Sequence, residues 1–356
     1  SLLPEPTEQS LGGVLAIPFA ATHRFPSDTT DTRYAFKANK GDALWIEIVS
    51  QRAGEPTDPR VRLQRIEVLE SGDSKFHDIA NADDAQAFSD GAMNLRTTDP
   101  TINFAAPATG DYQLLVRDLD IGSSLRPNQS YTVEVRPAKP GFDLLAYRVF
   151  PNKDVNQTRC FGTNLFRGGV EMIRVFVNRR EGFNGPVFLT CEGLPDGTSA
   201  TETVIAAGQT QTQIAIVADE DASASTNSIR IVGRSEDGSL RTEASAATIQ
   251  WAKGGGRDFV RTRLSTSIAV SVSDLDVAPI SIAPGANAAL ETKPATSIKL
   301  PFKLTRREGG TSPCTIRARD LPAGVTAADL TIAADKSEGE MELKIQKAAK
   351  PGSYSL

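Results

Sequence analysis

The chain has 356 residues, of which 39% are hydrophobic and 23% charged, and its formal net charge is −5 at pH 7. A chain of this length is expected to form two or three domains with buried cores, which excludes a mainly disordered protein. The charge is modest and no Lys/Arg cluster alternates with aromatic residues, so a nucleic-acid partner is excluded, and no apolar run reaches the roughly 18 residues of a membrane span.

Apolar and polar residues alternate with a period of two, and no long stretch shows the helical period of 3.6 residues. We therefore predict an all-β protein. Four strands are predicted in the first third, each of which places alternate apolar side chains on one sheet face. They contain Tyr34 and Phe36; Leu44, Ile46 and Ile48; Tyr112, Leu114 and Val116; and Tyr131, Val133 and Val135. Short strands separated by Gly-containing turns predict a β-sandwich.

Trp45 is out of phase with the apolar residues of its strand and belongs to the opposite face. It is either covered by the loop at 50–60 or displayed to a partner. A polar, proline-braced loop beside an aromatic residue is suited to binding a protein or a cell-surface component. The predicted partner-binding residues are Trp45, Gln51, Arg52, Asp58 and, from a later strand, Arg117.

Two acidic segments offer oxygen ligands of the kind that Ca²⁺ prefers. The candidate metal ligands are Asp83 and Asp84 in the first segment, close to Asp90, and Asp118 and Asp120 in the second. Their spacing does not match an EF-hand loop, so solvated acidic loops are the alternative interpretation. Ca²⁺ is the one cofactor that the sequence suggests.

Groups for catalysis are scarce. The only histidines are His23 and His77, and the chain contains neither a GxSxG nucleophile motif nor a phosphate-binding loop. We predict that the protein is not an enzyme, with a triad built on either histidine as the alternative. Cys160, Cys191 and Cys314 are far apart, and they are interpreted as free thiols or as one Cys160–Cys191 disulfide with a third free thiol.

Two breaks divide the chain. Residues 137–141 contain two prolines and a glycine, and residues 254–256 are three successive glycines. Neither run suits a strand interior. The predicted domains are therefore a sandwich at 1–137, a second at 141–252, a linker at 253–274 and a third sandwich at 275–356.

The second and third domains are related by an internal repeat. Arg179-Arg180-Glu181-Gly182 recurs as Arg306-Arg307-Glu308-Gly309, a shift of 306 − 179 = 127 residues, and the register persists on both sides. The later copy stops near the position where the strand around Ile229 would have its counterpart. We expect this copy to be incomplete, as in a fragment of a longer protein, with an open sheet edge.

Segments 40–48 (KGDALWIEI) and 108–116 (ATGDYQLLV) resemble the two signature hairpins of the bacterial pre-peptidase C-terminal domain. The resemblance covers residues 10–137 and implies a jelly-roll-like sandwich, commonly attached to secreted peptidases or to large exported proteins. Residues 141–252 and 275–356 resemble bacterial immunoglobulin-like domains through the Gly-Leu-Pro-x-Gly corner at Gly193–Gly197.

What the resemblance implies is an extracytoplasmic protein, either secreted, periplasmic or on the cell surface. We expect a non-catalytic structural or protein-interaction module of a larger bacterial protein, of the adhesion type. The alternatives are an accessory segment of a secreted peptidase or other hydrolase, which would aid folding, targeting or substrate capture, and a calcium-stabilised binding module.

Overall fold

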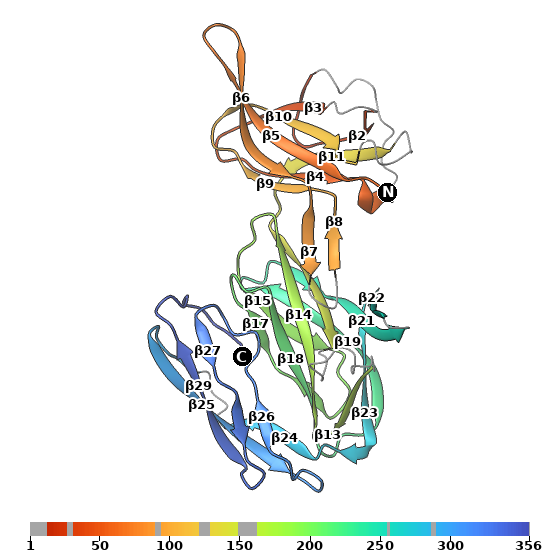
Figure 1. The fold of residues 1–356 in the computed structure, drawn as a ribbon, viewed down its shortest axis with the longest axis vertical. Coiled ribbons are helices and arrows are strands. Elements are labelled where there is room, and N and C mark those ends of the chain that lie inside the picture. Colours follow the sequence, from red (N-terminus) through yellow and green to blue (C-terminus); the bar gives the residue numbers. More distant parts are fainter. Residues whose placement is uncertain are drawn as a thin grey trace. The chain divides into compact units, whose positions relative to one another are not determined.

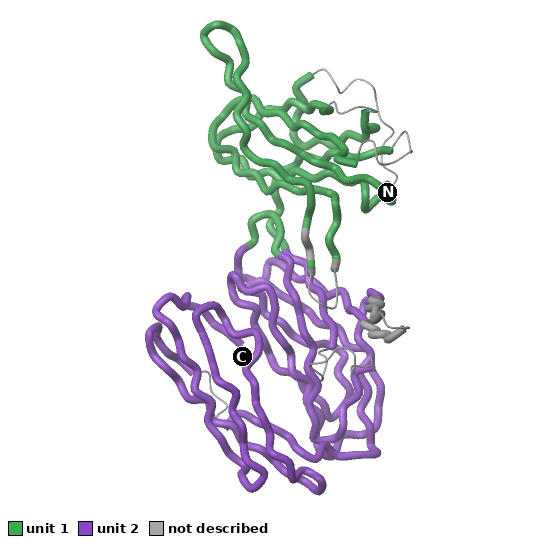
Figure 2. The backbone as a smooth tube through the Cα atoms, in the orientation of Figure 1, with its two compact units in different colours: residues 1–141, 179–183 green, residues 142–178, 184–356 purple. Residues whose placement is uncertain are grey.

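The computed structural model describes residues 13–26, 31–89, 94–120, 129–148, 162–254, 257–285 and 290–355. Over these residues the predicted all-β class is confirmed, because the chain forms strands in several sheets and, besides them, one short 3₁₀ turn, η2 (Gln51–Ala53). The chain divides into two compact units, residues 1–141 with 179–183 and residues 142–178 with 184–356 (Figure 2). In the described parts, no helix is long and apolar enough to span a membrane.

Unit 1 contains two main sheets and a small one. Its strands are β1 (Val14–Leu15), β2 (Phe19–Arg24), β3 (Thr32–Ala38), β4 (Ala43–Val49), β5 (Pro59–Val68), β6 (Ser74–Ala82), β7 (Ala85–Ser89), β8 (Asn94–Thr97), β9 (Thr101–Ala105), β10 (Gly110–Asp118) and β11 (Ser130–Pro137). One main sheet has the order β1-β3-β10-β5-β6 and the other β2-β11-β4-β9, while β7 pairs with β8 (Figure 1).

The core of unit 1 lies between its two main sheets. Every apolar residue of the four predicted strands is buried, with no more than 3% of its surface exposed. Tyr34 of β3 and Tyr131 of β11 meet across the core, where their hydroxyl oxygens are 2.7 Å apart in a hydrogen bond. The period-two pattern therefore predicted these strands and their inward faces correctly.

Unit 2 contains the other strands. They are β12 (Gly141–Arg148), β13 (Thr163–Arg167), β14 (Val170–Arg180), β15 (Val187–Glu192), β16 (Thr198–Ala200), β17 (Thr203–Ile205), β18 (Gln211–Ala218), β19 (Ser225–Ser235), β20 (Arg241–Glu243), β21 (Ser245–Gly254), β22 (Arg257–Ser265), β23 (Ile268–Val277), β24 (Ile280–Pro284), β25 (Thr296–Arg306), β26 (Cys314–Ile316), β27 (Val325–Ala327), β28 (Leu330–Ile332) and β29 (Glu338–Ile345).

These strands form two sets of sheets, which we call the first copy (β12–β23) and the second copy (β24–β29). The first copy has the orders β16-β18-β14-β12-β21-β22 and β13-β23-β19-β15-β17, with β20 added to β19. The second copy has the orders β24-β25-β29-β27 and β26-β28 (Figure 1).

The two copies share their strand register. β27, β28 and β29 each begin 127 residues after β16, β17 and β18 (325 − 198, 330 − 203 and 338 − 211). Ile173 pairs with Ile214 in the first copy, and Leu300 pairs with Met341 in the second, again shifted by 127 on both strands. The sequence repeat is thus a repeat of backbone pairing.

Left-handed backbone positions recur with the same shift. Gly168 has φ 65° and its counterpart Ala295 has φ 63°, while Gly193 has φ 80° and its counterpart Asp320 has φ 54°. Glycine adopts this conformation at little cost, whereas Asp320 gains hydrogen bonds there. Its carboxylate accepts Nε2–H groups from Gln211 and, at 2.7 Å, from Gln213 of the first copy.

The predicted linker at 253–274 is wrong. Residues 257–265 and 268–277 form strands β22 and β23, which pair with β21 and with β13 and β19. Val270 and Val272 alternate on the buried face of β23, with 0% and 4% exposure. The glycine run drew the boundary too early, because it lies at the turn between β21 and β22, where Gly254 pairs with Arg257.

Candidate partner-binding surface

The outer face of β4 carries Trp45 and Glu47, opposite the buried inner face of the same strand. Trp45 is half-buried, and its indole Nε1–H donates to Glu47 Oε2 at 3.2 Å. Arg52, from the loop after β4, donates from Nη2 to Glu47 Oε1 at 2.7 Å. The Glu47 carboxylate therefore joins the aromatic ring to the loop.

Asp99 holds this loop in place. Its fully buried carboxylate accepts backbone N–H groups of Ser50 (2.9 Å), Gln51 (2.7 Å) and Arg52 (2.9 Å), and also Nε–H of Arg52 (3.0 Å). Charged acceptors make the stronger kind of hydrogen bond. Four donors on one carboxylate fix the η2 turn and the direction of the Arg52 side chain.

Arg52 remains accessible despite these bonds, with 42% of its side chain exposed. Burial lowers the pKa of its guanidinium, but hydrogen bonds to Glu47 and Asp99 outweigh this effect and raise the pKa overall. The arginine is therefore a fixed cation beside a half-exposed indole. We call Trp45, Glu47, Gln51 and Arg52 the Trp45 surface.

Only part of the predicted binding set comes together here. Trp45 and Arg52 are joined through Glu47, and Gln51 precedes Arg52 and accepts the Thr97 hydroxyl at 2.8 Å. Arg117 instead lies in β10 of the other main sheet, and its Nε is 3.7 Å from Asp31 Oδ1.

Asp58 likewise belongs with the second acidic segment. Its backbone N–H donates to Asp118 Oδ1 at 2.9 Å, and the same oxygen accepts the Asp120 N–H at 3.2 Å. Burial raises the pKa of Asp58, and the charges of Asp84, Asp120, Asp118 and Asp83 raise it further. The two predicted acidic segments thus lie near each other, around Asp58.

The ability of these residues to hold Ca²⁺ stays a proposal. Asp118 is buried, with 4% exposure, and one of its oxygens already binds two backbone N–H groups. Within the described residues, no three carboxylate, histidine or cysteine side chains lie close enough to form a metal site. Asp90 lies outside the described residues.

The two hairpin motifs at 40–48 and 108–116 meet at their turns. The Lys40 N–H donates to Thr109 Oγ1 at 2.9 Å, and Lys37 Nζ lies 3.8 Å from Asp111 Oδ1. A hollow of about 210 Å³ lies between them, lined by Lys37, Ala38, Asn39, Thr109, Gly110 and Asp111. Its polar lining is used in contacts that hold the two turns together.

The histidines and cysteines occupy structural positions. His77 Nε2 is 2.6 Å from Glu67 Oε2, and the ring of His23 lies 5.7 Å from that of Tyr34, where burial lowers the pKa of the imidazole. Cys191 and Cys314 are free thiols, as one of the two interpretations expected. Burial raises the pKa of Cys191 to about 12, so its thiolate is rare at neutral pH. Cys160 lies outside the described residues.

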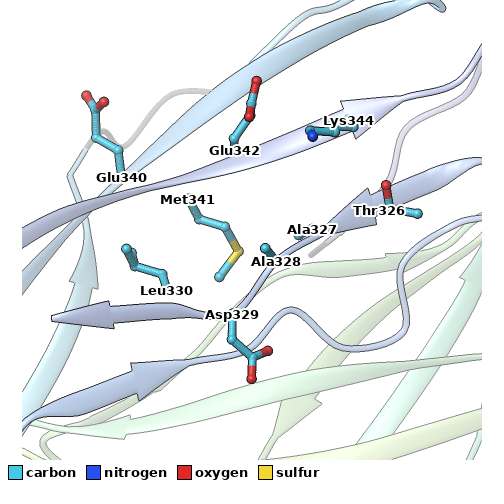
Figure 3. Close-up of a pocket in the computed structure, with 9 residues that line it drawn as sticks. All are labelled: Thr326, Ala327, Ala328, Asp329, Leu330, Glu340, Met341, Glu342 and Lys344. Carbon is cyan, nitrogen blue, oxygen red and sulfur yellow. The ribbon is translucent and has the colours of Figure 1, made fainter.

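A larger cavity, of about 370 Å³, lies in the second copy of unit 2 (Figure 3). The lining residues are Thr326, Ala327, Ala328, Asp329, Leu330, Glu340, Met341, Glu342 and Lys344. In the first copy, Thr201 makes two hydrogen bonds to the backbone of Ala215 at the equivalent place, one of them through its hydroxyl. Ala328 lacks that hydroxyl, which leaves the chain less tightly closed there.

This cavity does not have the chemistry of a catalytic site. Two of its acidic groups are paired, Asp329 with Arg317 at 2.7 Å and Glu340 with Lys299 at 3.2 Å. The remaining lining combines small apolar residues with the Met341 side chain, as Figure 3 shows.

Comparison with known proteins gives no family. No protein-family model matches the sequence, and no curated protein matches it. Among solved structures, the chain is similar to the structure of the S-layer protein SbsC, domains 5-6, with 13% sequence identity and a TM-score of 0.22, over 57% of this chain and 87% of that chain. A TM-score this low does not establish a shared fold.

The role of Asp99 could not be found in the sequence, because it is 47 residues from Arg52 and no local pattern links them. We expect Asp99→Asn to lower the free energy of opening of the Ser50–Arg52 segment by about 3 kcal/mol, because buried charges that lose a partner cost this much. Hydrogen exchange of the Ser50, Gln51 and Arg52 amides measures this change. Thr97→Ala, which removes one exposed hydrogen bond, is the control. Equal exchange rates in the two variants would contradict the assigned role.

The raised pKa of Asp58 predicts a pH-dependent effect. The folded state holds this proton more tightly than the unfolded chain, so the ionised carboxyl lowers stability above its folded pKa and has no effect below the ordinary Asp pKa. We expect Asp58→Asn to stabilise the protein at pH 7, by less than about 1 kcal/mol since the group is partly exposed, and not at pH 3. Denaturant unfolding at both pH values measures this, with Asp276→Asn, at an exposed position, as the control. A loss of stability at pH 7 would rule out the repulsion.

Proposed function

We propose that the chain is a non-catalytic, exported segment that binds a protein or a cell-surface component through the Trp45 surface. The observation that carries the proposal is the arrangement of Trp45, Glu47 and Arg52 on a loop braced by the buried Asp99. Tryptophan and arginine are the residues that most often dominate binding energy at protein interfaces.

A rigid loop favours this use. Binding to a flexible segment costs ordering entropy, whereas the backbone of Ser50, Gln51 and Arg52 is already held by one carboxylate. Arg52 can add a carboxylate of a partner to its present contacts, because it is partly exposed. The resemblance to pre-peptidase C-terminal and immunoglobulin-like domains supports an extracytoplasmic location.

Capture experiments test this proposal. The immobilised chain is incubated with cell-surface and secreted proteins of the organism that makes it, in parallel with Trp45→Ala and Arg52→Ala. We expect a component that both variants retain at least about tenfold less than the wild type does, as expected for hot-spot residues. Phe76→Ala is the matched control, since Phe76 is an exposed aromatic residue on β6 of the same unit.

Three outcomes of this work would count against the proposal or refine it. Identical retention by the wild type and both variants would remove the Trp45 surface from the binding site. A stable hydrolytic activity of the purified chain would overturn the non-catalytic assignment. Retention of a secreted hydrolase would favour the accessory-segment alternative.

The calcium-stabilised module is the second candidate, favoured by the acidic residues around Asp58. Under our leading proposal, the melting temperature in 1 mM Ca²⁺ and in chelator agrees within about 1 °C, because a site filled at 100 times its Kd would add about 2.7 kcal/mol. Thermal unfolding measures this. A rise of several degrees that Asp84→Asn abolishes would establish the calcium-stabilised module instead.

A further inference from the structure

The two copies of unit 2 differ at one sheet edge. In the first copy, β15 lies between β17 and β19 and pairs with both. Its counterpart β26 pairs with β28 in the same register, and within the described residues no strand occupies its other edge. The second copy therefore presents a free strand edge where the first copy has β19.

The inner face beside this edge is uncovered. Val187 and Leu189 of β15 are 0% and 1% exposed, whereas their counterparts Cys314 and Ile316 are only half-buried. The facing strand shows the same difference. Ile173 and Val175 of β14 are fully buried, while their counterparts Leu300 and Phe302 of β25 are half-buried. These differences share one cause, because β19 covers the core of the first copy and nothing described covers that of the second.

The first copy shows what fits such an edge. β19 runs antiparallel to β15, and Ile229 and Ile231 alternate on its buried face, with 0% and 2% exposure. The fit is close at Gly233, where an added Cβ would lie 2.9 Å from Val187 Cγ1. Pairing also lengthens the strand, since β15 extends to Glu192 while β26 ends at Ile316, three residues short of the counterpart of Glu192.

Charge distinguishes the two edges. Glu192 pairs with Arg230, its register partner on β19, at 3.8 Å, and with Arg241 at 3.3 Å. The counterpart of Glu192 in the second copy is Arg319 (192 + 127 = 319). A strand like β19 would place an arginine against Arg319, and like charges facing each other across strands are unfavourable. The residue that fits here is acidic.

We propose that the free edge of β26 accepts an additional strand from a partner polypeptide. The partner strand runs antiparallel to β26, carries apolar residues at alternate positions to cover Ile316 and Phe302, and has a carboxylate opposite Arg319. Backbone hydrogen bonds supply affinity in this mode, and side chains at alternate positions supply specificity. The residues involved are all in unit 2, so the proposal is independent of the Trp45 surface.

The test uses the full chain and two fluorescent 11-residue peptides with the sequence of β19, Ser225–Ser235, one of which carries Arg230→Glu. We expect saturable binding in fluorescence anisotropy, with the acidic peptide preferred by about fivefold, as an exposed ion pair gives. Arg319→Glu in the chain should reverse this preference. Because Arg319 lies outside the core strands, this variant tests the proposal without disturbing folding.

Ile316→Asp should weaken binding of the acidic peptide at least about tenfold, because it puts a charge where the apolar contact forms. Thr315→Asp, at the neighbouring position on the opposite face of β26, is the matched control and should bind as the wild type does. Circular dichroism checks that both variants keep their strand content.

Three results would overturn the proposal. The first is no saturable binding of either peptide to the wild-type chain. The second is an unchanged peptide preference in Arg319→Glu. The third is a wild-type dimer, seen by sedimentation, that dissociates in Ile316→Asp without any peptide, because it would assign the edge to a second copy of this chain.

Discussion

Each sheet of this protein has to bury one face, and the strands achieve this only in one register. Because side chains alternate along a strand, a slip of one residue would move the whole apolar set to the solvent face. The pairs Ile173 with Ile214 and Leu300 with Met341 show the constraint in two copies, since the same register recurs after 127 residues. Left-handed positions and strand starts recur in both copies because they serve this pairing.

The same constraint explains what the sequence predicted well. Tyr34, Ile46 and Leu114 belong to a set of apolar residues whose alternation placed them on inner faces, and the structure buries every one of that set. The repeat was readable because Arg179-Arg180-Glu181-Gly182 and its later copy keep both their residues and their spacing. Local pattern and pairing register agree wherever the strand contributes to a core.

Other features could not be predicted from local pattern. The residues at 268–272 alternate as a strand should, yet the glycine run before them was taken as the start of a linker, although a glycine run can equally be a hairpin turn. The Trp45 surface was found through the phase of Trp45, but its brace was not. Asp99 reaches Ser50, Gln51 and Arg52 only after β4 and β9 have paired, so its role depends on tertiary structure.

The free edge of β26 also has to avoid pairing with the wrong chains. An exposed edge strand is a template for aggregation, and proteins limit it with short strands and charged residues. β26 has three residues, and it is followed by Arg317 and Arg319. Arg317 is held by Asp329, so Arg319 is the cation that an incoming strand would face in the register of the first copy. A short edge limits affinity for arbitrary segments, while one cation selects a strand by its charge, and both together convert a liability into specificity.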